Sequence, residues 1–329
     1  MTRVLRLGTR GSPLAKVQAH AVSDRLRERG VETTIVIIKT EGDHLAERGP
    51  QAAVAAGTDG KRMFVKEIQD ALLAGTIDLA VHSSKDMPAV SPDGLRIVAT
   101  LPREDPRDAV ILAASAAGAV LDAHAPLASL GTAPRIGTSS VRRIAQLRGV
   151  VPDAVFLPIR GNLGTRLQKL DAGHYDALVL AAAGLRRLGQ QSRISGTLLV
   201  AICVPAPGQG IVAVEARTGD RDAIDAVAPI GDHASAVALT AEQAVVRRLD
   251  GGCQMPIGAY AEVDGETITL QCVVISPDGT SAARTVTRGA MAAPAEVGFE
   301  AATELLARGA AEILARVQRE RTSSARGGT

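Results

Sequence analysis

The first two-thirds of the chain alternates short, β-branched apolar runs with segments that repeat apolar residues every three or four positions. The apolar runs predict buried strands, and the repeating segments predict amphipathic helices. Strands are expected at 4–8, 33–39, 77–82, 154–159 and 176–180, and helices at 13–29, 64–74, 140–148 and 162–172. The pattern restarts at Arg135, where the segment RIGTS at 135–139 is expected to be the end of a strand. Repeated β-α-β units are typical of parallel sheets with helices on both faces.

The pattern changes after about residue 230, where a long helix precedes alternating strands. This part predicts an α+β module. It comprises a helix at 234–249, strands at 257–263, 266–275 and 281–288, and one terminal helix over 295–319.

Three segments interrupt the regular pattern. Proline-containing stretches at 102–107 (PREDPR) and 205–210 (PAPGQG) are candidate domain boundaries. The alanine-rich segment 113–133 predicts a loop or a poorly packed, peripheral insert.

Composition narrows the function. The 329 residues suffice for two or three domains, and with 46% hydrophobic but only 2% aromatic residues the cores must be aliphatic. Scarce aromatic residues disfavour a stacking platform for single-stranded nucleic acid. The net charge of +2 does not indicate a polyanion partner, so any positive site must arise from local clustering.

Cysteine usage and the apolar runs bear on the compartment. Three widely spaced cysteines predict neither a disulfide framework nor a zinc site, and they favour a reducing compartment. The N-terminal segment lacks the apolar run of a signal peptide, and no stretch is long enough for a membrane span. We therefore expect a cytoplasmic protein.

A polar turn follows the first predicted strand. Ser12 can cap the following helix, with Pro13 at its first position. Backbone N–H groups there, with Arg10 beside them, make a candidate anion site. A plain helix start with an exposed arginine explains the same residues equally well.

A second polar turn, His82-Ser83-Ser84-Lys85-Asp86-Met87-Pro88, directly follows the strand at 77–82. Ligands of open α/β sheets bind outside the carboxyl ends of strands. Lys85 can hold a substrate carboxylate while Asp86 faces a developing positive charge. The alternative is a solvated turn with a local salt bridge. We favour a functional site over this alternative because the turn lies at the end of a strand.

Arginines gather after the later strands. If the β-α-β reading holds, they converge on one sheet edge, where they would repel one another unless a ligand with several carboxylates or phosphates offset them. Any one of them could instead be a helix-surface arginine. They are Arg142 and Arg143, with Thr138 and Ser140 in the turn before them, then Arg160, Arg166, Arg186 and Arg187.

The cysteines differ in their surroundings. Cys203 and Cys272 lie in apolar runs and are expected in the core. Cys253 stands in LDGGCQMP, where the glycines leave space for a bulky adduct, although taken alone it could be either a reactive or a buried thiol.

Two other features give no site. The glycine-rich segment 57–61 does not match a phosphate-binding Walker loop and is expected to be a mobile loop. The six histidines show no pattern of metal ligands, so we expect no metal.

Together these segments resemble the porphobilinogen deaminase family, also called hydroxymethylbilane synthase. The matching segments occur in the family's order and cover residues 5 to about 260. Each segment alone is a weak signal, but their occurrence together is specific for this family. They are LGTRGSPLA, FVKEIQDALL, DLAVHSSKDMP, RIGTSSVRR, RGNLGTRLQKLD, LAAAGLRRLG, PAPGQG and LDGGCQMPIG.

The resemblance implies an α/β fold with two lobes like those of type II periplasmic binding proteins. Their sheets would be mixed and mostly parallel, and a smaller α+β C-terminal domain would carry the cofactor cysteine. The implied domains are residues 1–102 with 211–229 (discontinuous), 106–204, and 232–320, followed by a disordered tail at 321–329.

The resemblance also implies the reaction. Four porphobilinogen molecules would add in turn, each losing ammonia, to a dipyrromethane primer held by a thioether to Cys253. Hydrolysis would then release hydroxymethylbilane for tetrapyrrole and haem biosynthesis. Asp86 matches the catalytic carboxylate, which would stabilise the pyrrolic cations and the azafulvene formed on deamination and assist proton transfer.

The remaining site residues are carried over from the family's carboxylate-binding and polar positions. The cofactor-binding set is Cys253, Lys85, Ser84, Thr138, Ser140, Arg142, Arg143 and Arg166. The substrate-binding set is Arg10, Ser12, Arg160, Arg166 and Arg187.

The sequence departs from the family in one loop. Lys61 and Phe64 match the active-site loop, but Arg62 stands where the family usually has a glycine, and the preceding residues 44–60 are unusual.

Two other classes of function compete with this interpretation. One is a two-lobed solute-binding protein without catalysis, and the other is an anion-binding regulator, for which the chain shows no basic helix-turn-helix. Neither uses the GGCQ and SKD segments, and neither predicts a covalent adduct. We expect a monomer without nucleic-acid or membrane partners; transient hand-over of product to a downstream tetrapyrrole enzyme is a further option.

Overall fold

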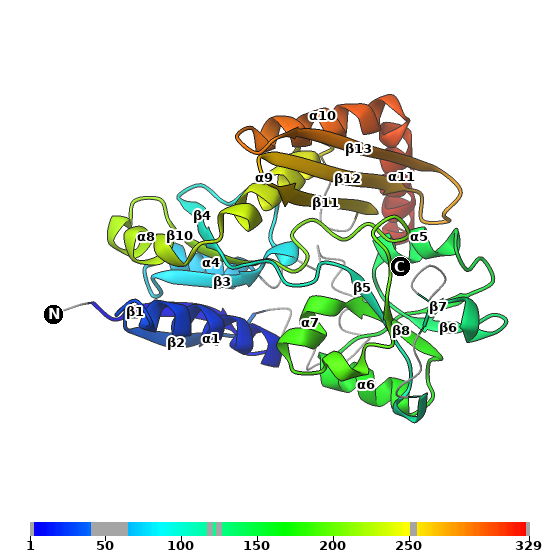
Figure 1. Ribbon diagram of the computed structural model, residues 1–329, viewed down its shortest axis with the longest axis horizontal. Helices are drawn as coiled ribbons and strands as arrows, with labels where there is room; N and C mark the ends of the chain where they lie inside the picture. The colour runs from blue at the N-terminus through cyan, green and yellow to red at the C-terminus, as the bar shows by residue number, and fades with distance from the viewer. Residues whose placement is uncertain (1–2, 41–64, 117–120, 123–126, 251–254, 327–329) are drawn as a thin grey trace. The chain divides into compact units, whose positions relative to one another are not determined.

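The computed structural model describes residues 3–40, 65–116, 121–122, 127–250 and 255–326, with side chains of the last helix described to Glu320. Contacts divide the chain into two compact units. The first unit is Met1–Glu104 with Gly210–Leu239, and the second unit is Asp105–Gln209 with Thr240–Thr329. Each contains a five-stranded mixed sheet, and the second also contains a three-stranded sheet (Figure 1).

The sheet of the first unit has the order β2-β1-β3-β10-β4. β1 is parallel to β2 and β3, whereas β10 is antiparallel to both β3 and β4. The strands are β1 (Leu5–Arg10), β2 (Thr33–Ile38), β3 (Leu79–Ser83), β4 (Leu95–Thr100) and β10 (Val212–Arg217). A late segment of the chain thus pairs between two early strands.

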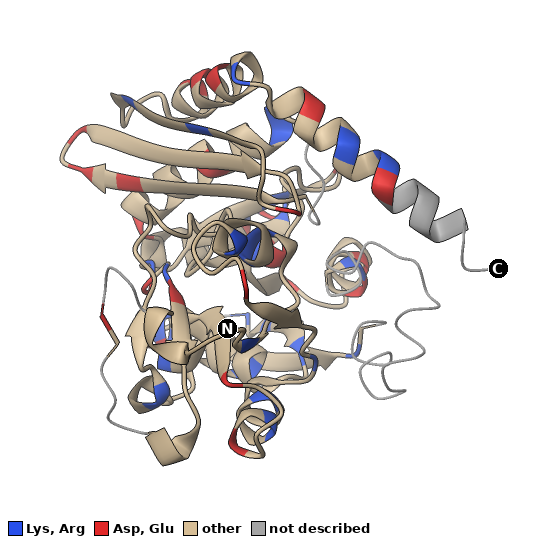
Figure 2. Cartoon of the chain, turned by 90° about the vertical axis from the view of Figure 1, so that its right-hand side faces the viewer, with Lys and Arg blue, Asp and Glu red and all other residues tan. Residues whose placement is uncertain are grey.

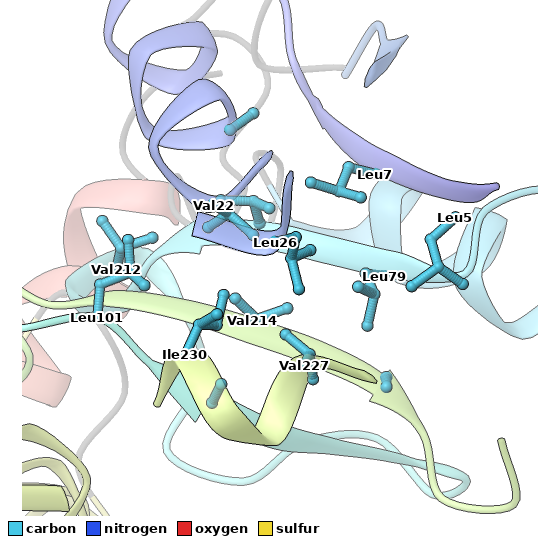
Figure 3. Packing of buried hydrophobic residues seen from close by; sticks show 14 of the residues in the cluster. Leu5, Leu7, Val22, Leu26, Leu79, Leu101, Val212, Val214, Val227 and Ile230 are labelled. Atoms are coloured by element: carbon cyan, nitrogen blue, oxygen red, sulfur yellow. The ribbon is translucent and has the colours of Figure 1, made fainter. Parts of the chain in front are cut away.

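Helices cover both faces of this sheet. The helices are α1 (Pro13–Arg27), α4 (Lys66–Leu73) and α8 (Arg221–Val227). Successive side chains of β3 point to opposite faces of the sheet, so the strand contributes to two cores. Leu79 packs with Val22 and Leu26 of α1, as Figure 3 shows. Ala80 packs with Leu72 of α4 on the other face. Ser12 caps α1 and Pro13 begins it, so both of those predictions are confirmed.

The larger sheet of the second unit has the order β7-β6-β8-β5-β9, with β6 parallel to β7 and β8, and β5 antiparallel to β8 and β9. Its strands are β5 (Asp108–Ile111), β6 (Arg135–Gly137), β7 (Val155–Leu157), β8 (Ala177–Ala181) and β9 (Gly196–Thr197). Its helices are α5 (Val141–Arg148), α6 (Leu163–Asp171) and α7 (Ala182–Arg187).

The rest of the second unit is an antiparallel meander, β11-β12-β13, with helices beside it. Its elements are β11 (Ile257–Asp264), β12 (Thr267–Ile275), β13 (Ala282–Ala290), α9 (His233–Arg248), which begins in the first unit, α10 (Pro294–Ala307) and α11 (Ala310–Arg326). Val273 and Ile275 of β12 pack against Ala145 of α5 and Val204, so the two sheets share a core. Acidic and basic residues intersperse along α11 (Figure 2).

The α/β class with mixed sheets and a smaller α+β module is confirmed, but two local predictions are wrong. The single helix expected over 295–319 is two helices, because Gly309 adopts the left-handed conformation (φ 89°) that ends α10. The segment 113–133 has no helix or strand beyond two short 3-10 turns among its described residues, in line with a loop, although Leu121 and Leu127 are buried in a core. α11 also extends to Arg326, into the segment predicted as a disordered tail.

One buried ion cluster stabilises the first unit at the start of β3. The carboxylate of Asp78 is fully buried and pairs with Arg3, with Arg6 (2.8 Å) and with Arg217 (3.5 Å). The backbone N–H of Arg6 also donates to it, at 2.9 Å. Burial alone would raise the pKa of Asp78, but the hydrogen bonds from Arg6 and the charges of Arg3 and Arg6 lower it to about 2.

Asp78→Asn is expected to destabilise the protein by about 2–3 kcal/mol at pH 7, because a carboxylate whose pKa is lower in the folded state stabilises that state when ionised. This contribution is present above the unfolded pKa of about 4 and is lost as the pH falls through about 2. Thermal and urea unfolding from pH 7 to pH 2 measures it, with the exposed Asp24→Asn as control. Equal Tm values at pH 7 for Asp78→Asn and the unsubstituted protein would contradict the prediction.

Candidate functional site

In the first unit, parallel pairing brings two predicted turns to the same sheet edge. Leu7 pairs with Leu79 and Gly8 with Ala80, so β1 and β3 end side by side. The chain continues from these ends into 10–12 and into the short 3-10 turn Ser84–Asp86. Residues Arg10, Ser12, Ser84, Lys85 and Asp86 therefore lie at one edge; Lys85 and Asp86 are half-buried.

Two contacts fix the turn that carries Asp86. The side chains of Gln18 and Ser83 are hydrogen-bonded, with 2.8 Å between Gln18 Nε2 and Ser83 Oγ. The N–H of Ser84 donates to the carbonyl oxygen of Ile211 at 3.0 Å. The turn is therefore attached both to α1 and to the segment that leads into β10.

Ser84 itself has an unsatisfied group. Its side chain is 3% exposed, and its hydroxyl has no hydrogen-bond partner among the residues that the structure describes. A buried hydroxyl without a partner is unfavourable. A polar ligand atom at this edge would satisfy it.

A buried polar cluster lies behind the same turn. Gln69 Nε2 donates to Glu215 Oε2 at 3.0 Å, and His82 Nε2 lies 3.5 Å from the same oxygen. Burial raises the pKa of Glu215, but the hydrogen bonds and the charge of His82 outweigh it, so the pKa is lowered. Sequence reasoning missed Gln69 and Glu215, because their partners come from distant segments.

In the second unit, β7, β6 and β8 are parallel neighbours, so their carboxyl ends share an edge. The N–H of Thr138 donates to the carbonyl oxygen of Leu157 at 3.0 Å, which connects the turn after β6 to the end of β7. Ser140 caps α5 by accepting from the N–H of Arg143. The hydroxyls predicted at this cap therefore lie at the expected strand ends.

Arg142 and Arg143 are buried and converge on one carboxylate, Asp108. Arg142 Nη2 lies 2.7 Å from Asp108 Oδ2, and Arg143 Nη2 lies 2.8 Å from Asp108 Oδ1. Their exposed fractions are only 5% and 8%, and Asp108 is fully buried. Burial raises the pKa of Asp108, but the two guanidiniums hold it well below the usual range.

Two further side chains complete this network. Gln209 Nε2 donates to Asp108 Oδ1 at 2.8 Å and to the carbonyl oxygen of Pro106 at 2.6 Å. Cys203 Sγ donates to Asp108 Oδ2 at 3.3 Å. Cys203 is buried as predicted, but its surroundings are polar as well as apolar. Sequence reasoning missed Asp108 and Gln209, which stand at the two candidate boundaries.

The other arginines of this edge lie nearer the surface. Arg160 is exposed, whereas Arg166 and Arg187 are half-buried. Arg166 Nε donates to the carbonyl oxygen of Gly161 at 2.8 Å. Arg186 Nη2 lies 3.7 Å from Asp105 Oδ2.

Several predicted positions lie outside the described residues: Cys253 and the loop residues Lys61, Arg62 and Phe64. Within the described ranges, no group of three or more His, Cys, Asp or Glu side chains could hold a metal ion. No helix in those ranges has the length and apolarity needed to cross a membrane.

Two family models match the chain. The model described as "Porphobilinogen deaminase, dipyromethane cofactor binding domain" matches residues 5–225. The model described as "Porphobilinogen deaminase, C-terminal domain" matches residues 236–307.

Solved structures that resemble the chain include a BvgS domain and two substrate-binding or solute-binding proteins. The VFT2 domain of Bordetella pertussis BvgS is 16% identical, with 69% of this chain and 86% of that chain covered and a TM-score of 0.38. A periplasmic substrate-binding protein of an ABC transporter from Coxiella burnetii is 12% identical, with 69% and 91% covered and a TM-score of 0.39. An ancestral cationic amino acid solute-binding protein is 14% identical, with 69% and 87% covered and a TM-score of 0.41.

Cys203 and Cys272 are expected to resist alkylation in the native protein. Burial raises the pKa of Cys203 to about 12 and that of Cys272 well above its usual value. The raised pKa keeps Cys203 in the thiol form at pH 8, and only the thiolate is nucleophilic. Iodoacetamide labelling followed by peptide mass spectrometry measures this, with urea-unfolded protein as the positive control. Rapid native labelling of either thiol would contradict the burial described here.

Proposed function

The chain belongs to the porphobilinogen deaminase family, and from this premise we propose that Asp86 is its catalytic carboxylate and Cys253 the attachment point of its cofactor. The activity is that of a hydroxymethylbilane synthase, a transferase. Four porphobilinogen molecules are joined in turn with loss of ammonia, and hydrolysis releases the linear tetrapyrrole. The dipyrromethane cofactor, when bound, supplies the pyrrole to which the first substrate is joined.

The observation that carries this proposal is the sheet edge of the first unit, where 10–12 and 84–86 meet. As ammonia leaves porphobilinogen, positive charge develops on the pyrrole ring. The half-buried carboxylate of Asp86 stabilises that charge more strongly than a fully solvated one would, and it can accept a proton from the pyrrole. Lys85 has the opposite charge and is suited to a carboxylate of the cofactor.

The residues present fit a dipyrromethane with acetate and propionate side chains. Two buried guanidiniums, those of Arg142 and Arg143, share the single carboxylate of Asp108, so one positive charge is left to offset. A ligand carboxylate would supply the offset, and the hydroxyl of Ser84 would gain the partner it lacks.

We assign the cofactor and substrate positions accordingly. Ser84, Lys85, Thr138, Ser140, Arg142, Arg143 and Arg166 would hold the cofactor, and Arg10, Ser12, Arg160, Arg166 and Arg187 would bind substrate carboxylates. Lys61 and Phe64 would belong to the active-site loop.

The proposal also covers the domain boundaries, the oligomeric state and the cellular compartment. The three sheets support a division into domains at 1–102 with 211–229, at 106–204, and at 232–320, the last carrying Cys253. We further propose a cytoplasmic monomer that needs no membrane or nucleic-acid partner and can hand its product to a downstream tetrapyrrole enzyme.

The intact mass of the purified protein is expected to exceed the sequence mass by two pyrrole units, with the excess on the Cys253 peptide. Cys253→Ala should lack the excess and the activity, because the two other thiols, those of Cys203 and Cys272, are buried and their pKa values are raised. Cys272→Ala, which replaces a buried thiol of β12, is the matched control and should keep both. An active Cys253→Ala protein would remove the cofactor from this position. An unmodified protein that gains no adduct from porphobilinogen would favour a non-catalytic binding module.

Asp86→Asn is expected to keep the fold and the adduct but to lose turnover by at least about a hundredfold, because it removes the charge that stabilises the pyrrolic cation. Product formation from porphobilinogen measures the effect, with intact mass confirming the adduct. Asp93→Asn, an exposed carboxylate of the same unit, is the control. Normal turnover in Asp86→Asn would remove this residue from the mechanism.

A further inference from the structure

We propose that Asp108 is a positioning residue for the cofactor: its carboxylate orients Arg142 and Arg143 toward the ligand's carboxylates and connects that orientation to the two segments 105–108 and 203–209. This inference rests on the cofactor-binding role proposed above for the two arginines. Asp108 itself needs no contact with cofactor or substrate.

Both carboxylate oxygens of Asp108 accept hydrogen bonds from side chains that lie far from Asp108 in the sequence. Oδ1 accepts from Arg143 Nε at 3.0 Å and from Gln209 Nε2 at 2.8 Å. Oδ2 accepts from Arg142 Nη2 at 2.7 Å and from Cys203 Sγ at 3.3 Å. Because a carboxylate offers about four lone-pair directions, its capacity is fully used.

The geometry of α5 makes this carboxylate necessary. Arg142 and Arg143 are adjacent on the helix, and adjacent helical residues do not face each other. Their like charges would also drive the two side chains apart. Convergence of both guanidiniums therefore requires a shared anion, and Asp108 supplies it.

The carbonyl groups around the network fix each guanidinium at a second point. Arg142 Nη1 donates to the carbonyl oxygen of Val204 at 2.6 Å, and Arg143 Nη1 donates to that of Val179 at 3.1 Å. A planar guanidinium held at two points has one orientation, which is how a charge is preorganised for a ligand. Loss of the carboxylate would leave each arginine held only by a neutral acceptor.

The strand order places Asp108 beside the proposed site. β5 is antiparallel to β8, and Asp108 pairs with Ala181, so the beginning of β5 lies next to the end of β8. That is the edge where the turns after β6 and β7 also lie. Asp78 provides a contrast: it is equally buried among arginines, but it lies just before β3, at the opposite end of that strand from Ser84.

This contrast gives the experiment a matched control. Asp108→Asn and Asp78→Asn each remove one buried charge from an arginine cluster while keeping the shape of the side chain. Both are expected to lower Tm. Only Asp108→Asn is expected to reduce the fraction of folded, soluble protein that carries the two-pyrrole adduct, by about tenfold or more, because it leaves two misoriented guanidiniums. Intact mass gives the adduct fraction, and circular dichroism confirms folding.

Equal adduct fractions in folded Asp108→Asn and Asp78→Asn would overturn the inference and leave Asp108 a purely structural residue. A wild-type protein that neither carries the adduct nor gains it from porphobilinogen would instead overturn the proposed function, and this inference with it.

Gln209→Leu keeps the inference testable if Asp108→Asn does not fold. This substitution removes the hydrogen bond from Gln209 to Asp108 Oδ1, together with the bonds that Gln209 makes with the carbonyl oxygen of Pro106 and with Arg143, and it leaves every charge in place. We expect it to slow adduct formation from porphobilinogen severalfold in the folded apoprotein. Unchanged loading kinetics in a folded Gln209→Leu protein would overturn the inference.

Discussion

Two guanidiniums can be buried side by side only if a negative charge lies within reach, and the second unit is organised around the carboxylate that meets this requirement. Asp108 begins β5, and its antiparallel pairing with β8 places it at the edge where the parallel strands end. The segments before β5 and after β9 then meet through Gln209, which bonds both Asp108 and the carbonyl oxygen of Pro106. The direction of one strand thus determines where the charge cluster lies.

The first unit holds its polar turn through backbone pairing and through a side-chain contact with α1. Its site residues follow parallel strands, and the turn at Ser84 is held by the carbonyl oxygen of Ile211, which precedes β10. Because β10 comes from late in the chain and pairs between β3 and β4, the turn forms only when distant segments have met. Its ion cluster at Asp78 lies beyond the opposite end of β3 and stabilises the sheet without contacting the turn.

Local features of this fold could be predicted from sequence, and features that depend on distant pairing could not. Ser12 and Ser140 are helix caps because a hydroxyl beside a helical pattern bonds its own neighbours. β10 and β5 were missed because their pairing partners are remote and antiparallel, whereas repeated β-α-β units suggest parallel neighbours. Asp108 was missed for the same reason: in PREDPRDAV it looks like one more charge at a boundary. Gly309 ends a helix, although a glycine within a helical pattern is often tolerated.

The two kinds of arginine in the second unit suit two kinds of ligand. Arg142 and Arg143 are buried and fixed by Asp108, so binding to them costs little side-chain entropy but permits little adjustment. That rigidity suits a cofactor that stays in place through every cycle. Arg160 is exposed, so it can reorient its long side chain. That freedom suits substrate carboxylates whose number and position change as the product lengthens.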